Sequence, residues 1–271
     1  MSAVLQRILS TSAVRRADGT EAPVHSHISE TEVEFIQSLV RSHKPRVSLE
    51  VGCAFGISSL YICEALKSID AERHIVIDPR QNDVDQWQGI GLLNLQRAGF
   101  SDLVEFHAEP SYECLPKLLA RGQRIDFAFI DGVHNFDYVL VDFFMIDKML
   151  NVGGVVVFDD YSWPSVRKAC RFIAANLPYH CIGPTGHKAR LKNRLASAVA
   201  QLPLLSRWSR SELSLPDQVL GLPPGSASFV AMQKHAEDRL GTGAECTRGW
   251  ASHKAFLAGS NTHSAPNGKT A

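Results

Sequence analysis

The chain has 271 residues, 45% hydrophobic and 21% charged, which is ordinary for a globular protein and enough for one sizeable α/β domain with appendages. Lysine plus arginine number 28, as do aspartate plus glutamate, and this balance argues against a surface built to bind nucleic acid or an anionic membrane. We therefore expect no nucleic-acid partner. No apolar run approaches the length of a membrane span, so we also expect no integral membrane segment.

Two features bear on the cellular compartment. Residues 1–17 contain three arginines and no acid, so this N-terminal extension (1–28) begins either with a mitochondrial transit peptide or with an amphipathic helix that docks on the domain. We favour docking. The six cysteines show no C-x-x-C or zinc spacing and are expected to be reduced, which suits the cytoplasm.

After a polar linker over residues 18–28, Ser29 and Glu32 have the form of a capping box that opens a helix ending at Lys44 and Pro45. Strands and helices then alternate, which predicts a doubly wound α/β fold with a mostly parallel sheet, an N-terminal helix and a C-terminal insertion. The expected strands are 47–52, 74–78, 103–107, 125–130 and 155–158, and the expected helices are 57–69, 85–99, 111–121, 135–150 (ending at Gly153 and Gly154) and 164–176.

The C-terminal third departs from this alternation. Residues 179–183 and 228–232 are expected to add two strands, so the main domain extends over 29–235. Within it, residues 184–226 form an insertion whose basic stretch, 186–210, is expected to be a lid or surface helix; a membrane-surface or partner-binding helix is the alternative. The tail, 236–271, is polar and expected to be disordered.

A strand–turn–helix over residues 47–58 holds Gly52 and Gly56 in its turn. Such a turn exposes backbone N–H groups at a helix N-terminus, where an anionic group binds, and glycine lets a ligand approach closely. An ordinary turn of an α/β sheet is the alternative. Asp78 ends the next strand, where nucleoside-binding folds place an acid for the ribose hydroxyls. Ala54 stands where the dinucleotide fingerprint has its second glycine, which argues against an NAD-dependent oxidoreductase.

Acidic or polar positions, and one glycine, lie at or just after the end of every strand of the predicted parallel sheet. They are Glu50 and Gly52, Asp78, Glu109, Asp131 and His134, and Asp159 and Asp160. Converging carboxylates repel one another unless a cation compensates, so Asp131, Asp159 and Asp160 suggest a site for Mg²⁺, which prefers oxygen ligands. The alternative is that Asp159 or Asp160 caps the following helix and Asp131 bonds loop amides.

The pattern Glu50-x-Gly52-x-x-x-Gly56 resembles the first motif of class I S-adenosylmethionine (SAM)-dependent methyltransferases, and Asp78 resembles their second. Residues 129–136, Asp142, Gly153-Gly154 and 158–160 are similar to the small metal-assisted O-methyltransferases, both the catechol-type group and the group of the cephalosporin-modifying enzyme. The likeness covers about residues 30–180.

This resemblance implies roles for individual residues. Gly52 and the turn through Gly56 to Ser58 would face the methionine part of SAM, Asp78 the ribose and Glu109 the adenine amine. Glu50 and Asp131 are also expected to bind the cofactor. Asp131, Asp159 and Asp160 would hold the ion that binds the acceptor oxygen. Neighbouring Ser111 is expected to cap its helix.

His134 stands where the catechol-type enzymes have their lysine base. Its ordinary protonation range suits a general base, although a loop-bracing role is open. Asp160 replaces their asparagine.

We therefore expect metal-assisted O-methylation of a small hydroxylated molecule. Assembly of the chain into a homo-oligomer is compatible with this expectation. The alternative outside enzymology is a SAM-binding regulatory partner without catalytic activity.

Overall fold

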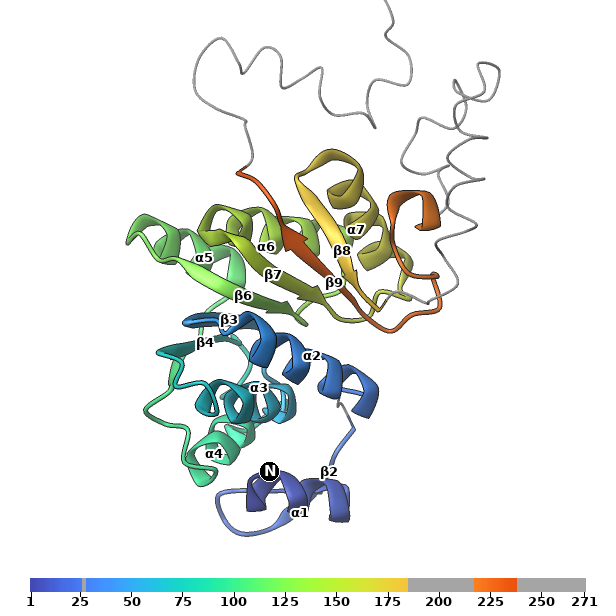
Figure 1. Ribbon diagram of the computed structural model, residues 1–271. Helices are drawn as coiled ribbons and strands as arrows, with labels where there is room; N and C mark the ends of the chain where they lie inside the picture. Colours follow the sequence, from blue (N-terminus) through green and yellow to red (C-terminus); the bar gives the residue numbers. More distant parts are fainter. Residues whose placement is uncertain (26–27, 185–216, 238–271) are drawn as a thin grey trace, which may run out of the picture.

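The computed structural model describes residues 1–25, 28–184 and 217–237. Its centre is a seven-stranded sheet in the order β5-β4-β3-β6-β7-β9-β8, in which only β9 runs antiparallel to its neighbours (Figure 1). The strands are β3 (Val47–Val51), β4 (Arg73–Ile77), β5 (Val104–His107), β6 (Ile125–Ile130), β7 (Leu150–Phe158), β8 (Tyr179–Gly183) and β9 (Val230–Lys234). The predicted doubly wound, mostly parallel α/β fold is confirmed.

Helices cover both faces of the sheet (Figure 1). One layer holds α2 (Glu30–His43), α3 (Ile57–Lys67) and α4 (Ile90–Arg97); the other holds α5 (Ser111–Ala120), α6 (Phe136–Met149) and α7 (Pro164–Asn176). Strand β6 contributes side chains to the cores on both faces of the sheet. Phe127 and Phe129 pack in a core with α2 and α3, whereas Ala128 and Ile130 pack in a core with α5, α6 and α7, because successive strand side chains point to opposite faces.

The N-terminal segment is more structured than predicted. Helix α1 (Ala3–Thr11) docks on the domain with Leu5 and Ile8 buried, in agreement with the docking interpretation of this segment. The expected linker contains β2 (Glu21–Pro23), which pairs with β1 (Ala13–Arg15). The turn between them has an Asp-Gly pair, and Asp18 accepts a hydrogen bond from the Thr20 amide at 2.9 Å.

Several boundaries differ from prediction. Helix α4 begins at Ile90 rather than near residue 85, because the preceding Gly89 takes a left-handed conformation. Helix α6 ends at Met149 and passes directly into β7, so Gly153 and Gly154 lie within the strand rather than ending the helix.

The predicted cap at Ser29 is confirmed, since its hydroxyl accepts from the Glu32 amide at 3.4 Å. The cap at Ser111 is wrong, because the N-cap of α5 is Pro110.

Other predictions are only partly covered. Cys53, Cys63, Cys114, Cys170 and Cys181 are free thiols, as expected. In the part of the chain that is described, no helix is long and apolar enough to cross a membrane. The basic stretch 186–210 and the tail from residue 238 lie outside the described residues, and of the insertion 184–226 only Pro184 and 217–226 are described, including the short helix Asp217–Leu220.

Candidate active site

The glycine turn after β3 is shaped first by the protein's own backbone. Gly52 has φ +95°, and a Cβ there would lie 2.1 Å from the carbonyl oxygen of Asp131. Gly56 has φ +74°, and its Cβ would meet the Gly91 carbonyl oxygen at 2.9 Å. Both positions therefore exclude larger residues because neighbouring segments approach closely, which is a different reason from the ligand approach that the sequence suggested.

Glu50 lies beneath this turn rather than in a cavity. It is fully buried, and its carboxylate accepts hydrogen bonds from the hydroxyls of Ser58 and Ser59, while the His74 ring nitrogen Nε2 lies 3.0 Å away. Ser48 in turn bonds the other ring nitrogen of His74 at 2.8 Å. The geometry makes Glu50 a brace for the start of α3, and direct contact with a cofactor is left as a prediction for Gly52 and Ser58, which line cavities.

Asp78 holds the same turn from the neighbouring strand. Its Oδ2 accepts from the amides of Cys53 at 3.1 Å and Ala54 at 3.0 Å, and its Oδ1 accepts from the Arg80 amide at 2.9 Å. It also lines a cavity of about 440 Å³ that we call the aromatic cavity. The side chains that give this cavity its character are Trp87, Tyr112, Val133 and Tyr138.

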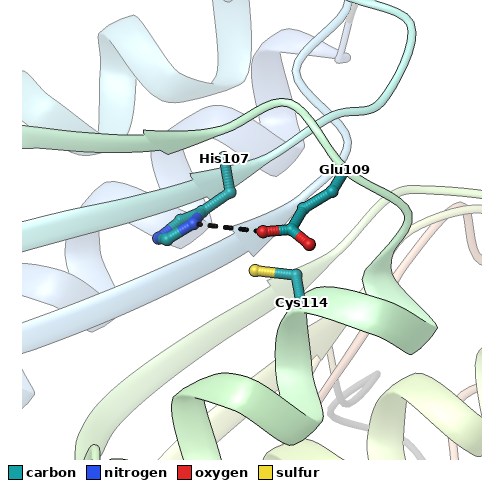
Figure 2. A group of neighbouring side chains, drawn as sticks. All are labelled: His107, Glu109 and Cys114. Carbon is teal, nitrogen blue, oxygen red and sulfur yellow. Dashed lines mark ion pairs between the residues drawn. The ribbon is translucent and has the colours of Figure 1, made fainter.

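Glu109 is not among the residues that line the aromatic cavity. Figure 2 shows it beside His107 of β5 and Cys114 of α5, with its Oε1 4.0 Å from His107 Nδ1. These three could in principle surround a metal ion. However, Lys117 already pairs with Glu109, and burial raises the pKa of the Cys114 thiol to about 11, so the thiol is protonated and a poor ligand. Pro110, Ser111 and Tyr112 line the aromatic cavity where Glu109 was expected.

The predicted metal ligands do meet. Asp131 after β6 and Asp159 and Asp160 after β7 line a second cavity of about 380 Å³, which we call the acidic cavity. Asp159 and Asp160 do not cap α7, whose N-cap is Trp163. Instead the Asp159 carboxylate accepts from the Asp160 amide at 2.7 Å, and Asp160 has φ +50°. The capping alternative is therefore wrong for both residues.

The acidic cavity brings several carboxyl groups together. Burial and the adjacent Asp159 carboxylate hold the pKa of Asp131 well above its usual range, and the same two causes raise the pKa of Asp160 against the opposing effect of His134. No lysine or arginine lines this cavity in the described part of the chain. The arrangement favours either bound protons or a bound cation.

His134 lies where the two cavities meet and lines both. Its Nε2 is 3.4 Å from Asp131 Oδ1, and its Nδ1 is 3.5 Å from Asp160 Oδ2. Nε2 is buried and has no hydrogen-bond partner among the described residues. The exposed ring of Trp163 stands 5.4 Å from the imidazole, centre to centre. Nε2 therefore keeps a hydrogen-bonding position that no described residue fills.

Sequence reasoning missed Glu32 of α2, a further acid that lines the acidic cavity. The sequence assigned Glu32 to a capping box, which accounted for an acid at this position without a role in ligand binding. It also missed the aromatic residues Trp87, Tyr112 and Tyr138, for which the sequence held no periodic signal.

Asp142 of α6 is a buried acid near the site but outside both cavities. It is 2% exposed, its Oδ1 has no hydrogen-bond partner in the described residues, and burial raises its pKa to about 6 despite a hydrogen bond from Ser111. The charged form is therefore disfavoured in the folded state, and stability from this group is lost as the pH rises from about 4 through about 6.

Asp142→Asn should consequently stabilise the protein at pH 8 by roughly 2–3 kcal/mol, following 1.36 kcal/mol per unit of pKa, and the gain should vanish near pH 4. Urea unfolding of wild type and variant across this range measures the difference. Asp137→Asn, an exposed acid on the same helix, is the control and should bring no such gain. A constant difference at all pH values would contradict the assignment.

Several known proteins are similar in sequence to this chain. Residues 49–161 match the family model described as a methyltransferase domain. The chain is 26% identical over 137 residues to caffeoyl-CoA O-methyltransferase 1 of Eucalyptus globulus, covering 50% of this chain and 52% of that protein. It is also 44% identical over 57 residues to the uncharacterized protein R132 of Acanthamoeba polyphaga mimivirus, covering 20% and 26%. The chain thus spans about half the length of the caffeoyl-CoA relative that it matches.

Solved structures share the fold. An O-methyltransferase of Bacillus cereus in complex with SAH superposes with a TM-score of 0.54 at 21% identity, covering 67% of this chain and 83% of that one. The O-methyltransferase TomG of Streptomyces achromogenes, in complex with SAM, gives 0.53 at 22% identity, with coverage of 69% and 86%.

Proposed function

We propose that this chain is a class I methyltransferase and that it transfers the methyl group of SAM to a hydroxyl oxygen of a small acceptor with the help of a divalent cation, Mg²⁺. The observation that carries the proposal is the pair of adjoining cavities at the carboxyl edge of the parallel strands. One is aromatic and the other acidic, and they share Cys53, Ala54, Asp131 and His134. In open α/β sheets ligands bind at this edge.

The aromatic cavity fits the nucleoside part of the cofactor. Its volume lies within the usual range for small-molecule sites, and its aromatic side chains offer flat apolar surface to an adenine ring. Asp78 keeps the glycine turn in place and presents its carboxylate at the cavity wall, where ribose hydroxyls would donate to it. SAM supplies an electrophilic methyl group on its sulfonium sulfur.

The acidic cavity fits a hard cation, because its ligands are carboxylate oxygens and because no lysine or arginine described there neutralises them. Asp131, Asp159 and Asp160 would hold the ion, which as a Lewis acid lowers the pKa of an acceptor hydroxyl. His134 then receives the proton at Nε2, and the protein aligns acceptor oxygen and methyl group across the junction of the cavities.

The acceptor is expected to be small, hydroxylated and free of negative charge near the reacting oxygen, because the cavity already carries several carboxylates. The exposed Trp163 ring beside His134 offers an apolar wall for a flat acceptor such as a phenol. The similarity to the caffeoyl-CoA O-methyltransferases supports a phenolic acceptor.

Calorimetry with S-adenosylhomocysteine (SAH) tests cofactor binding. Asp78→Ala should weaken SAH binding by roughly 10- to 150-fold, the equivalent of about 1.5–3 kcal/mol for a charge-assisted hydrogen bond. Asp83→Ala, an exposed acid that pairs with Arg80 on the same loop, is the matched control and should bind SAH like wild type. Unchanged affinity in a folded Asp78→Ala variant would contradict the ribose assignment, and a mass-spectrometric screen of phenols and other alcohols with SAM would identify the acceptor.

A further inference from the structure

Glu32 is a buried acid that has no basic partner among the described residues. It is the third residue of α2, only 1% exposed, and it lines the acidic cavity. Its Oε1 is buried and has no hydrogen-bond partner among the described residues. A buried carboxylate oxygen left without a donor is costly, so its position calls for an explanation.

Helix capping does not supply that explanation. A glutamate at this position of a capping box turns back toward the N-cap amide and stays near solvent. Ser29 makes its half of the box by accepting from the Glu32 amide, but the Glu32 side chain extends into the cavity instead. The helix dipole favours an acid in the first turn by less than about 1 kcal/mol at exposed positions, which does not offset burial.

The neighbours of Glu32 are the proposed metal ligands. Burial raises the pKa of Glu32, and Asp159, through its charge and a side-chain hydrogen bond, raises it further, as do the charges of Asp131 and Asp160. Glu32 comes from the helix layer, whereas the three aspartates come from the ends of β6 and β7, so the four carboxylates face one another across the cavity. A cation placed among them would satisfy the orphan oxygen of Glu32 and relieve the repulsion.

We propose that Glu32 is a fourth carboxylate ligand of the same divalent ion, an inference that rests on the metal site of the proposed function. The ion then joins the first turn of α2 to the ends of β6 and β7. Because Ile28 and Ser29 also line the acidic cavity, ion binding fixes the N-terminal wall against which the acceptor lies.

Manganese serves as the probe, because free Mn²⁺ is counted directly by electron paramagnetic resonance. In the presence of SAH, Glu32→Gln should weaken Mn²⁺ binding by at least 10- to 100-fold, which is the loss usual even for residues that only support a ligand. Glutamine keeps the size of the side chain and the capping-box pattern. Glu30→Gln removes an exposed carboxylate from the same helix turn and should bind Mn²⁺ like wild type.

Melting temperatures separate a ligand from a structural brace. In EDTA, Glu32→Gln should melt at or above the wild-type temperature, since it removes a buried acid whose charged form the ion-free fold disfavours, and Mn²⁺ should raise its melting temperature less than that of wild type. Equal Mn²⁺-induced shifts in both proteins, or a lower melting temperature of the variant in EDTA, would overturn the proposal.

Asp159→Asn provides the reference for the site itself. If wild type binds Mn²⁺, Asp159→Asn loses it and Glu32→Gln keeps it, the Glu32 assignment fails while the metal site stands. If wild type binds no Mn²⁺, the metal site and the role of Glu32 fail together, and SAH binding still reports on the rest of the proposed function.

Discussion

Chelation of divalent ions with EDTA is expected to abolish methyl transfer and to leave SAH binding largely intact. The ion would act on the acceptor in the acidic cavity, whereas the nucleoside part of the cofactor would lie in the aromatic cavity. Lewis-acid stabilisation is worth several kcal/mol, so turnover should fall by roughly 10²–10⁴-fold. A product assay in EDTA, paired with SAH calorimetry in the same buffer, measures both quantities.

Asp159→Asn tests the same site without a chelator. Asp159 lines only the acidic cavity, whereas Asp131 lines both, so Asp159 is the cleaner choice. Asparagine still accepts the hydrogen bond from the Asp160 amide, which preserves the loop. The variant should lose turnover to a similar degree, and added Mg²⁺ should restore the chelated wild type but not the variant. Full activity of wild type in excess EDTA would show that the carboxylates serve another purpose.

The strands and helices could be predicted from local sequence patterns where burial of a segment requires apolar residues. Strand β6 has an unbroken apolar run from Phe127 to Ile130, as a strand covered on both faces requires. The hairpin of β1 and β2 was not predicted, because each strand has only three residues, which are too few to show an alternating pattern. The antiparallel entry of β9 between β7 and β8 depends on contacts far apart in the chain, which residue patterns alone do not encode.

The site was predicted as far as the geometry of parallel strands determines it. Asp131 and Asp159 follow adjacent strands, and the carboxyl ends of such strands meet at one edge, so their proximity could be expected. Glu109 also follows a strand, but its side chain turns to Lys117 and His107, and strand order says nothing about side-chain direction. Glu32 reaches the cavity only because α2 packs beside α3, which is a tertiary contact.

Replacement of His134 by alanine should reduce kcat by roughly 10²–10⁴-fold, the usual contribution of a positioned general base, with SAH affinity nearly unchanged. The imidazole lines both cavities rather than pointing into the core, and its buried Nε2 has no hydrogen-bond partner among the described residues. Both features support the proposed role of His134 as the base. His43→Ala, an exposed histidine at the end of α2, is the control and should keep the wild-type rate.

The dependence of kcat on pH distinguishes a base from a residue that only braces the loop. His134→Ala should lose the pH profile of the wild type and show a low rate that rises with hydroxide concentration, because hydroxide then replaces the base of the protein. His134→Lys should recover part of the rate, because the catechol-type enzymes use a lysine at the corresponding place. If His134→Ala retains the wild-type kcat, the ion alone ionises the acceptor. His134, 3.4 Å from Asp131 and 3.5 Å from Asp160, would then serve to hold those two carboxylates apart.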